Sequence, residues 1–596
     1  MSSALSPVKV ATAACSLILL VAGVWVLCGY VWPTYSNPEV AAVQAMVDPG
    51  LFQRDFVVQE AMHFSPRFYY SAMIVALART GLPLAWVFVV WHLAALAVLI
   101  ASFRSLVRTL GVGAVASAVL LVWLIFVRIG TVGLTFTYQN APVPAMWAIA
   151  AVAAGAALAV RGRTSAAYAC FGGAALLQFL VGFYAGVLAL PLLWRASPRQ
   201  RVGALALWAL GLALVYLPMR LAATTDSGVL ASPAFVEIYA QLHLPHHLVP
   251  SSWGWPIWIQ FAVFYAGAGW FLHRTAAGRS PTERVVFNFT MAVMVVGLVL
   301  NYVFVELHPV ALVAKLQPAR ITPLAQCVVL TLLALRVQTC VVQKDWLRAL
   351  LLALIPLSLF PGLLLLLAAV LTTVGPSRSK FPWPTVLLAI AVVLTFQPFE
   401  ESFGARTLRY GLCAALFLLQ LIAAWLEDRP RRLAVAAALA AAGAALCARA
   451  SLRPDWPPFL MIRFAVDAAP IDPEGILGRR FGARSHPDAI VLLPPDGEAW
   501  SFKLHARRAV VVDTKSVPFS DRGLREWQVR MEDVLGRPIV RGMYLDAAWK
   551  ARTPEQLFAV AQRYHARYLL TRDDWHPTMI GRRIDQEQGW SLWQLY

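Results

Sequence analysis

The sequence predicts an α-helical polytopic membrane protein with a hydrophilic α/β domain at its C-terminal end. Hydrophobic residues make up 59% of the 596-residue chain and charged residues only 14%, whereas soluble domains carry about a quarter charged residues. Apolar runs long enough to cross a bilayer recur from residue 9 to about residue 449. Beyond residue 450 charged residues, proline and tryptophan become frequent, and helix and strand patterns mix. We therefore expect a transmembrane domain at 1–449, with an outer loop at 33–81, and an extracytoplasmic α/β domain at 450–596.

The apolar runs define the expected membrane spans. They lie near residues 9–32, 82–103, 110–128, 141–160, 202–222, 255–272, 283–306, 319–337, 384–398, 405–426 and 432–449. Two further runs, 165–194 and 347–374, are longer and are interrupted by glycines or by prolines. Each of these predicts either one long tilted helix or two short halves that return to the same side.

Basic residues in the short loops indicate the orientation. They cluster at 104–108, 161–163, 195–201, 274–284, 336–348 and 429–432. Such loops stay on the cytoplasmic side, and treating both interrupted runs as hairpins puts every cluster there. We therefore expect roughly 11 to 15 membrane helices, a cytoplasmic N-terminus and an outer C-terminal domain. The net charge of +19 follows from these loops and does not indicate nucleic-acid binding.

Several elements are expected outside the bundle. The stretch 67–80 is apolar, short and rich in tyrosine, which predicts a helix lying at the outer membrane interface. In the C-terminal region, strands are expected near 488–493, 499–504, 509–513, 567–570 and 591–596. Helices are expected to begin at Ser520 and at Thr553, where Thr-Pro-Glu-Gln has the capping pattern.

Several classes of protein lose their usual sequence support. The seven cysteines lie in or beside apolar segments without metal-ligand spacing, which argues against zinc sites, iron–sulfur clusters and disulfides. The chain has no phosphate-binding glycine loop followed by Lys-Ser/Thr, no G-x-S-x-G and no H-E-x-x-H. His243, His246 and His247 share an outer segment, but Pro245 interrupts the helical spacing that a regular metal site would need.

Acidic residues gather in the outer loop that follows the first span. Glu39, Asp48, Asp55 and Glu60 lie there in a chain that otherwise has few acids, and carboxylates held at a membrane face usually have a task. Asp48 begins an Asp-Pro-Gly turn and Glu39 follows Pro38 at a helix start, so both have a structural explanation. Asp55 precedes Phe-Val-Val without a capping pattern, which makes it the main candidate for a general base.

Cations near the outer ends of spans are candidates for binding a lipid-linked phosphate. Lys315 and Arg320 flank Pro318 in Lys-Leu-Gln-Pro-Ala-Arg, and Arg128 is a third candidate. Arginine can bind phosphate through two parallel hydrogen bonds and lysine as a point charge. The alternative is that these long side chains snorkel at helix ends. No residues are assigned to a metal, although a divalent metal, Mg or Mn, is a candidate cofactor beside a phosphate.

Two stretches resemble a known class of proteins. Met46-Val-Asp-Pro-Gly-Leu-Phe-Gln-Arg-Asp55, followed by Ser65-Pro-Arg-Phe, is similar to the first outer loop of uncharacterised bacterial GT-C-like membrane proteins. His486-Pro-Asp-Ala-Ile-Val-Leu-Leu-Pro-Pro-Asp-Gly497, and then Arg507-Arg-Ala-Val-Val-Val-Asp513, is similar to their C-terminal domain. The layout of the chain resembles the GT-C class of polyprenyl-phosphate-dependent glycosyltransferases. The Trp-Trp-Asp-Tyr-Gly signature of the oligosaccharyltransferase catalytic subunit and the paired Asp-Glu of protein mannosyltransferases are absent.

The resemblance implies a membrane glycosyltransferase in the bacterial inner membrane, with a periplasmic C-terminal domain. Such an enzyme transfers a sugar from a polyprenyl-phosphate donor to an envelope glycan, lipid or protein on the outer face. The residues that would act are Asp55 or Asp48 as the base, Lys315, Arg320 and Arg128 at the donor phosphate, and Glu39, His63 and Asp496 towards the acceptor.

Two alternatives come from other functional classes. The interrupted runs 165–194 and 347–374 are also typical of transporters or lipid flippases, which place broken helices at a midplane site. A non-catalytic scaffold whose C-terminal domain binds envelope partners is the second alternative. Sugar transfer, flux in vesicles and partner binding distinguish the three.

Overall fold

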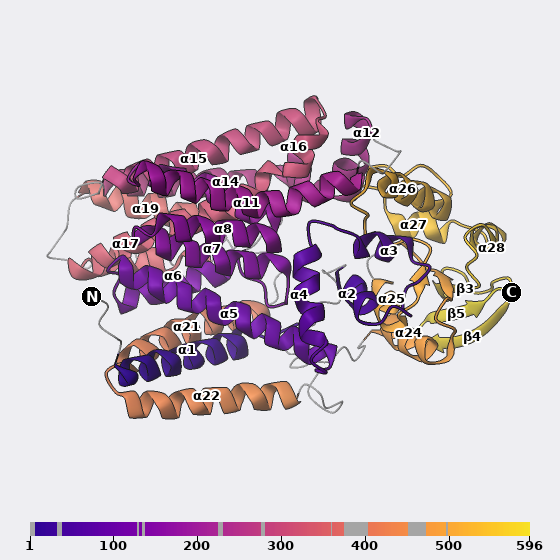
Figure 1. Ribbon diagram of the computed structural model, residues 1–596, viewed down its shortest axis with the longest axis horizontal. Coiled ribbons are helices and arrows are strands. Elements are labelled where there is room, and N and C mark those ends of the chain that lie inside the picture. The colour runs from indigo at the N-terminus through magenta and orange to yellow at the C-terminus, as the bar shows by residue number, and fades with distance from the viewer. Residues whose placement is uncertain are drawn as a thin grey trace.

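The computed structural model describes residues 6–31, 39–127, 130–133, 137–223, 230–275, 281–358, 360–374, 403–450, 472–495 and 499–596. Long helices run side by side in a bundle, and a smaller domain of helices and strands lies against one end of it (Figure 1). The start of α1 Pro7–Cys28 lies at the other end of the bundle. The predicted fold class, an α-helical polytopic membrane protein with a C-terminal α/β domain, is confirmed.

Each expected span within the described residues coincides with a helix. These helices are α1 Pro7–Cys28, α5 Leu84–Thr109, α6 Ala114–Phe126, α7 Pro144–Val160, α11 Pro198–Ala223, α14 Gly254–Arg274, α15 Pro281–Tyr302, α17 Thr322–Val342, α21 Phe403–Leu426 and α22 Pro430–Ala450. By length and composition, seven helices in the described part of the chain could cross a membrane, and further apolar helices are shorter. The span expected at 384–398 lies outside the described residues.

The first interrupted run is a helical hairpin. It contains α8 Thr164–Leu177, α9 Phe179–Leu188 and the short α10 Leu190–Leu193. The chain reverses at Gln178, whose backbone is extended between the two helices. Tyr168 then donates a hydrogen bond to the carbonyl of Gly186 over 3.1 Å, and a Cβ on Gly182 would meet the carbonyl of Phe171 at 2.5 Å. These pairings bring the two halves back alongside each other.

The second interrupted run also folds back. It contains α18 Trp346–Ala353, the 3₁₀ turn η5 Ile355–Leu357 and α19 Pro361–Val374. The guanidinium of Arg348, near the start of α18, donates to the carbonyl of Leu371, near the end of α19, over 3.4 Å. The two ends of the run therefore lie together, as the hairpin interpretation predicts.

Short elements cover the end of the bundle that faces the C-terminal domain. They are α2 Glu39–Val47, α3 Phe56–Met62, α4 Phe68–Ala78, α12 Ser232–Val236, the π-helix η1 Glu237–His243, α13 Pro245–Leu248, η2 Pro250–Trp253, the π-helix η3 Val303–Leu307, α16 Ala311–Leu316 and η4 Pro318–Ile321. The helix expected at 67–80 is α4, which runs across the bundle axis between the long helices and the C-terminal domain (Figure 1).

The C-terminal domain contains a five-stranded sheet in the order β2-β1-β3-β5-β4. Its strands are β1 Ile490–Leu492, β2 Ala509–Val510, β3 Tyr568–Arg572, β4 Arg582–Glu587 and β5 Trp590–Gln594. The strands β2, β1 and β3 are parallel, whereas β5 runs antiparallel to β3 and β4 antiparallel to β5. The strands expected at 488–493, 509–513, 567–570 and 591–596 are confirmed. The polar edge strand β4 was not predicted, because its exposed Arg-Arg-Ile-Asp-Gln-Glu sequence lacks an apolar alternation.

The strand expected at 499–504 is wrong, because this segment forms helix α25 Trp500–Ala506. Trp500, Phe502 and Leu504 alternate along the sequence as in a strand, but Ser501 and Lys503 between them are buried as well. The segment also links two adjacent parallel strands, and such a link needs a crossover that is usually helical. Topology therefore outweighs the local pattern.

Helices cover both faces of the sheet. On one face α24 Pro473–Arg484 and α25 pack against side chains such as Val491 and Leu570. On the other, α26 Asp521–Leu535, α27 Leu545–Lys550 and α28 Pro554–Arg563 pack against Leu492 and Leu569. The predicted caps are confirmed: Ser520 caps α26, and Thr553 forms a capping box in α28.

The C-terminal domain shares hydrophobic cores with the outer segments of the membrane part. The core between the sheet and the helices α26, α27 and α28 continues into Phe235 and Val305 of the outer segments. Trp500 and Leu504 of α25 join the core formed by α2, α4 and the start of α5. Burial of this shared apolar surface holds the domain against the bundle.

Candidate functional site

A buried ion-pair group joins the first outer loop to the C-terminal domain. The ammonium of Lys503 lies 2.9 Å from Asp55 Oδ2 and 3.0 Å from Asp513 Oδ2, and the exposed fractions of the three side chains are 0%, 1% and 2%. Backbone N–H groups complete it: Val58 and Val510 donate to Asp55 at 3.0 and 3.1 Å. Burial disfavours the charge of Lys503, but Asp513 and Asp55 outweigh burial and raise the pKa of Lys503.

This geometry changes the interpretation of Asp55. The statement that it lacks a capping role is wrong, because Asp55 caps α3 by accepting from Val58. The cap escaped the sequence pattern because the third helical position is Val58 rather than Glu or Gln. Both carboxylate oxygens are engaged and the side chain is buried. The arrangement favours a docking role for Asp55, because both of its carboxylate oxygens are already engaged by backbone N–H groups and the Lys503 ammonium.

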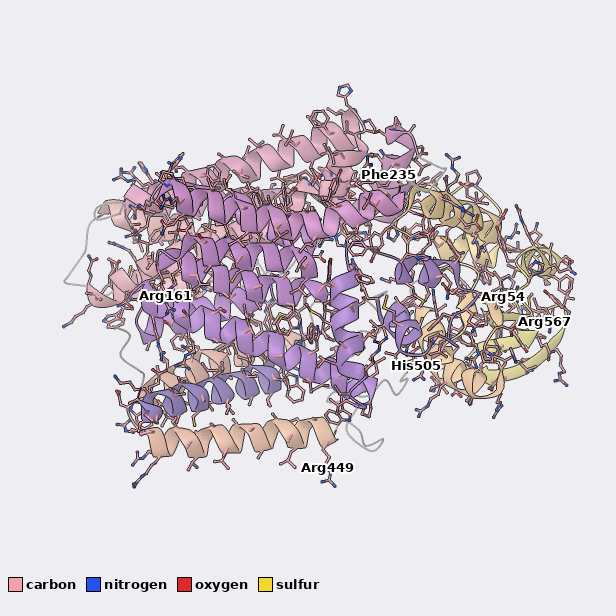
Figure 2. The ribbon with its side chains drawn as sticks, in the orientation of Figure 1. Arg54, Arg161, Phe235, Arg449, His505 and Arg567 are labelled. Atoms are coloured by element: carbon pink, nitrogen blue, oxygen red, sulfur yellow. The ribbon has the colours of Figure 1, made fainter. Side chains whose placement is uncertain are left out.

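A second set of contacts lies along the same boundary between the membrane part and the C-terminal domain, here called the seam. Ser520 donates to both carboxylate oxygens of Glu60 at 2.8 and 3.0 Å. Asp521 accepts from the Leu230 N–H at 3.0 Å and from Lys315 at 3.4 Å. The Lys315 ammonium also lies 4.3 Å above the ring of Phe235, at the bundle end nearest the C-terminal domain (Figure 2). Lys315 is thereby paired within the seam, and half of its side chain remains exposed.

Further along the seam lies a group of basic side chains, here called the cationic cluster. Its members are Arg67, Arg320, Lys515, His243, His246 and His247, and they come from α4, η4, the C-terminal domain and the η1–α13 segment. Their fields overlap: Arg320 acts on Arg67, His246 and His247, and Lys515 acts on His243 and His246. Four separate segments therefore bring basic groups to one place.

Negative charge is scarce in the cationic cluster. Glu39, which is 7% exposed, forms an ion pair with Arg67. Arg320 and Lys515 form no ion pair with any carboxylate in the described ranges. Burial lowers the pKa of Arg67 to about 10, with Tyr239 opposing and Arg320 adding to the shift. Arg320 is therefore a partly buried cation without an acidic partner among the described residues, and Lys515 is an exposed one, which makes the cationic cluster a candidate site for an anion.

The histidines of the cationic cluster are held neutral. Burial, followed by the fields of neighbouring basic groups, lowers the pKa of both His243 and His247 to about 3. His247 Nδ1 lies 2.6 Å from the carbonyl oxygen of Gly133, and because a carbonyl only accepts, Nδ1 carries the proton. An anion bound here would reverse the shift, because negative charge favours protonated histidine.

The other predicted site residues fall elsewhere. Asp48 is exposed and accepts from the Gly50 N–H at 3.0 Å, which is the turn that its sequence indicates. His63 is exposed at the C-terminal end of α3. Arg128 and Asp496 lie outside the described residues. Arg320 and Glu39 are therefore the predicted residues that the structure brings together, through Arg67.

Several residues of the seam and site were missed by the sequence analysis. Lys503 lay inside the segment expected to be a strand, and Arg67 and Lys515 were given no functional role. The charges of Arg67 and Lys515 become informative only once the fold brings them beside Arg320. Apart from the three histidines, each member of the cationic cluster comes from a different stretch of the sequence.

A metal ion does not fit this site. Across the described ranges, no group of three or more His, Cys, Asp or Glu is arranged to hold a metal. In the cationic cluster the carboxylate of Glu39 is already paired with Arg67, and hard cations such as Mg²⁺ prefer several oxygen ligands. No step of the chemistry is therefore assigned to Mg or Mn.

A hollow in the C-terminal domain offers a contrast. It has a volume of about 510 Å³ and is lined by the end of α26 and by α28. Its lining carries three arginines and two carboxylates, and Arg563 pairs with Asp533 over 2.8 Å. Basic and acidic groups are therefore more nearly balanced here than in the cationic cluster.

Comparisons with known proteins give one family match and several similar solved structures. A model for a domain of unknown function, DUF6798, matches residues 477–534. No curated protein matches the chain. The solved structure of arabinofuranosyltransferase AftD from Mycobacteria is similar at 14% identity and a TM-score of 0.40, covering 100% of this chain and 40% of that one. The function proposed below rests on this chain's own geometry, because a likeness of this size does not define an activity.

The family match covers the docking part of the C-terminal domain. Residues 477–534 include Lys503, Asp513, Lys515, Ser520 and Asp521. These side chains make the contacts with the outer loop and Lys315, or add charge to the cationic cluster. The matched segment thus includes the residues of the C-terminal domain that make these contacts with the membrane part.

Replacing the buried Lys503 should weaken the docking of the C-terminal domain against the membrane part. Lys503→Met leaves Asp55 and Asp513 buried without their cation, and removing one partner of a buried ionic group costs about 3–5 kcal/mol. Thermal unfolding in nanodiscs should show this loss. Limited proteolysis should also cut the variant faster between the two parts.

The matched control is Lys515→Met, a nearby exposed lysine without an ion pair among the described residues, whose effect on stability should stay within about 0.5 kcal/mol. Equal stability of the two variants would contradict the docking role of Lys503.

Acidification should destabilise the outer end of the protein. The unfolded chain protonates His243 and His247 below about pH 6.5, whereas the native pKa of each is about 3. Stability is therefore complete above pH 6.5 and is lost as the pH falls towards 3, by about 1–2 kcal/mol per histidine at pH 5. Unfolding temperatures between pH 7.5 and 4.5 measure this slope, and His247→Gln should flatten it. An unchanged slope in that variant would show that His247 is not held neutral.

Proposed function

We propose that the chain is a GT-C-like membrane glycosyltransferase that takes its sugar from a polyprenyl-phosphate donor. The observation that carries this proposal is the cationic cluster, an excess of basic groups with one carboxylate at the end of a membrane helix bundle. A lipid carrier keeps its chain in the bilayer and its phosphate at the membrane surface. The cationic cluster lies where such a phosphate would be presented.

The donor phosphate would be held by Arg320 and Arg67, with Lys515 completing the charge. Arg320 has no carboxylate partner among the described residues, and Arg67 already lies within its field. Arginine suits this role because its planar group can bind two phosphate oxygens together. Lys315, paired with Asp521, contributes at the edge of this site.

Glu39 is the carboxylate best placed to act as the general base. It is buried beside Arg67, which fixes its orientation. In the transfer, Glu39 takes the proton of an acceptor hydroxyl while that oxygen forms a bond to C1 of the sugar. The bond from C1 to the phosphate oxygen breaks, and Arg320 and Arg67 stabilise the charge that grows on the departing phosphate.

The orientation proposed is a cytoplasmic N-terminus with the C-terminal domain in the periplasm of a bacterial inner membrane. Arg161, in one of the basic loops, lies at the bundle end far from the C-terminal domain (Figure 2). The positive-inside rule assigns that end to the cytoplasm. The acceptor would then be an envelope glycan, lipid or protein.

The test is transfer of radiolabelled sugar from a polyprenyl-phosphate donor by the protein in nanodiscs. Glu39→Gln should lower kcat by about 10²–10⁴-fold, because a general base contributes that much, while donor binding changes little. Asp48→Asn, in the same loop but exposed, is the matched control and should retain activity. A larger loss in Asp48→Asn than in Glu39→Gln would overturn the assignment. Donor flux across vesicles without transfer would favour the transporter class.

A further inference from the structure

Gln317 has an unusual backbone at the centre of the proposed phosphate site. It ends α16 and precedes η4 with φ 44° and ψ 64°, in the left-handed region that residues other than glycine rarely adopt. The residue is 7% exposed. On one side, the carbonyl of the preceding Leu316 accepts from Tyr184 at 2.7 Å. On the other, the Gln317 carbonyl accepts from the Arg320 N–H at 2.9 Å. Neighbouring groups thus hold the strained conformation in place.

The side-chain amide of Gln317 bridges two polar groups of different segments. Arg320 Nε lies 3.0 Å from Gln317 Oε1, and Gln317 Nε2 lies 2.8 Å from the Tyr239 hydroxyl. A guanidinium only donates, so the amide oxygen must face Arg320. The amide nitrogen then faces Tyr239 and also only donates, so the Tyr239 oxygen must accept.

The direction of these bonds decides what remains free for a ligand. Arg320 uses Nε on Gln317, so its two Nη groups are the part left to meet an anion. Tyr239 uses a lone pair on Gln317, so its hydroxyl proton is left to be donated to a ligand. Burial raises the pKa of Tyr239 although Arg320 and Arg67 oppose the shift, so the phenol keeps its proton at neutral pH. Arg67 lies within the electrostatic reach of both groups.

We propose that Gln317 is a positioning residue that makes Arg320 and Tyr239 a paired donor set for the lipid-linked phosphate. Arg320 supplies charge, and the Tyr239 hydroxyl supplies one directed hydrogen bond to a phosphate oxygen. This inference rests on the proposed function for the identity of the ligand, and on the Gln317 bonds for the geometry. It assigns a ligand-binding role to Tyr239, which lies on the π-helix η1, and π-helices often occur at functional sites.

The test uses a change that keeps the bridge but reverses one bond. In Gln317→Glu the carboxylate accepts from Arg320 and also from Tyr239, so the tyrosine proton turns inward and is lost to the ligand. In the wild-type background the Tyr239 proton is available to the ligand, so Tyr239→Phe should weaken phosphate binding by about 10-fold or more. In the Gln317→Glu background the same change should have less than about a 2-fold effect. The added negative charge acts equally on both arms of this cycle and cancels.

Gln317→Met provides a second background if Gln317→Glu folds poorly. It removes both bonds at similar volume, so the effect of Tyr239→Phe should again shrink. Binding is measured on the full chain in nanodiscs with polyprenyl phosphate, with inorganic phosphate, and with polyprenol as the uncharged control. None of these readouts requires sugar transfer.

The outcomes separate the two proposals. If polyprenyl phosphate binds, and if Tyr239→Phe weakens this binding in the wild type but not in the Gln317 variants, both the proposed function and the role of Gln317 are supported. Polyprenyl phosphate that binds with an equal Tyr239→Phe effect in all backgrounds overturns the role of Gln317 and leaves the proposed function standing. Inorganic phosphate that binds with the predicted pattern while polyprenyl phosphate does not supports Gln317 and overturns the lipid donor. Binding of neither probe overturns both.

Discussion

The ammonium of Lys503, buried between Asp55 and Asp513, fixes how the two parts of the protein meet. A charge in a low-dielectric interior is tolerated only when it is paired and hydrogen-bonded, and here each carboxylate also accepts from backbone N–H groups. These requirements are met in one register of the C-terminal domain against α3. A small shift of the C-terminal domain relative to α3 would leave buried charges or N–H donors unpaired, so few relative positions of the two parts are allowed.

That geometry determines what the outer end of the bundle can bind. With α25 locked against α3, the segment after Asp513 brings Lys515 into the field of His246, and Phe519 lies 5.9 Å from the Arg67 guanidinium. The C-terminal domain therefore contributes Lys515 to the cationic cluster, and η4 of the membrane part contributes Arg320. The excess positive charge of this composite site is the physical basis for assigning it to a phosphate.

The hydropathy and capping patterns predicted much of the architecture. Apolar runs marked the helices, and the basic ends of 165–194 and 347–374 favoured the hairpins that the structure contains. Local patterns also predicted the caps at Ser520 and Thr553 correctly, where each side chain accepts from a backbone N–H three residues further along the chain. Two local signals were missed, the Asp55 cap and the polar strand β4. The error at α25 involves a long-range contact, because this segment is a helix that links the parallel neighbours β1 and β2, and a local pattern does not contain that pairing.

The site was only partly predictable for the same reason. Arg320 was identified because Pro318 marked its position at a helix mouth, but its neighbours come from distant segments. Asp55 was chosen as the base because its apparent lack of a structural role suggested chemistry. Its second partner, the Val510 N–H, lies 455 positions away along the chain. Glu39 was explained as part of a helix start and placed towards the acceptor, and only its ion pair with Arg67 connects it to the cationic cluster.

A structure of the protein in nanodiscs with bound polyprenyl phosphate would show whether the cationic cluster holds the phosphate of a polyprenyl-linked donor. We expect phosphate density between Arg320, Arg67 and the Tyr239 hydroxyl, within hydrogen-bond distance of the Arg320 Nη groups. We also expect the lipid chain to leave this site towards the bilayer. Phosphate density at the other end of the bundle, beside Arg161, would contradict this assignment.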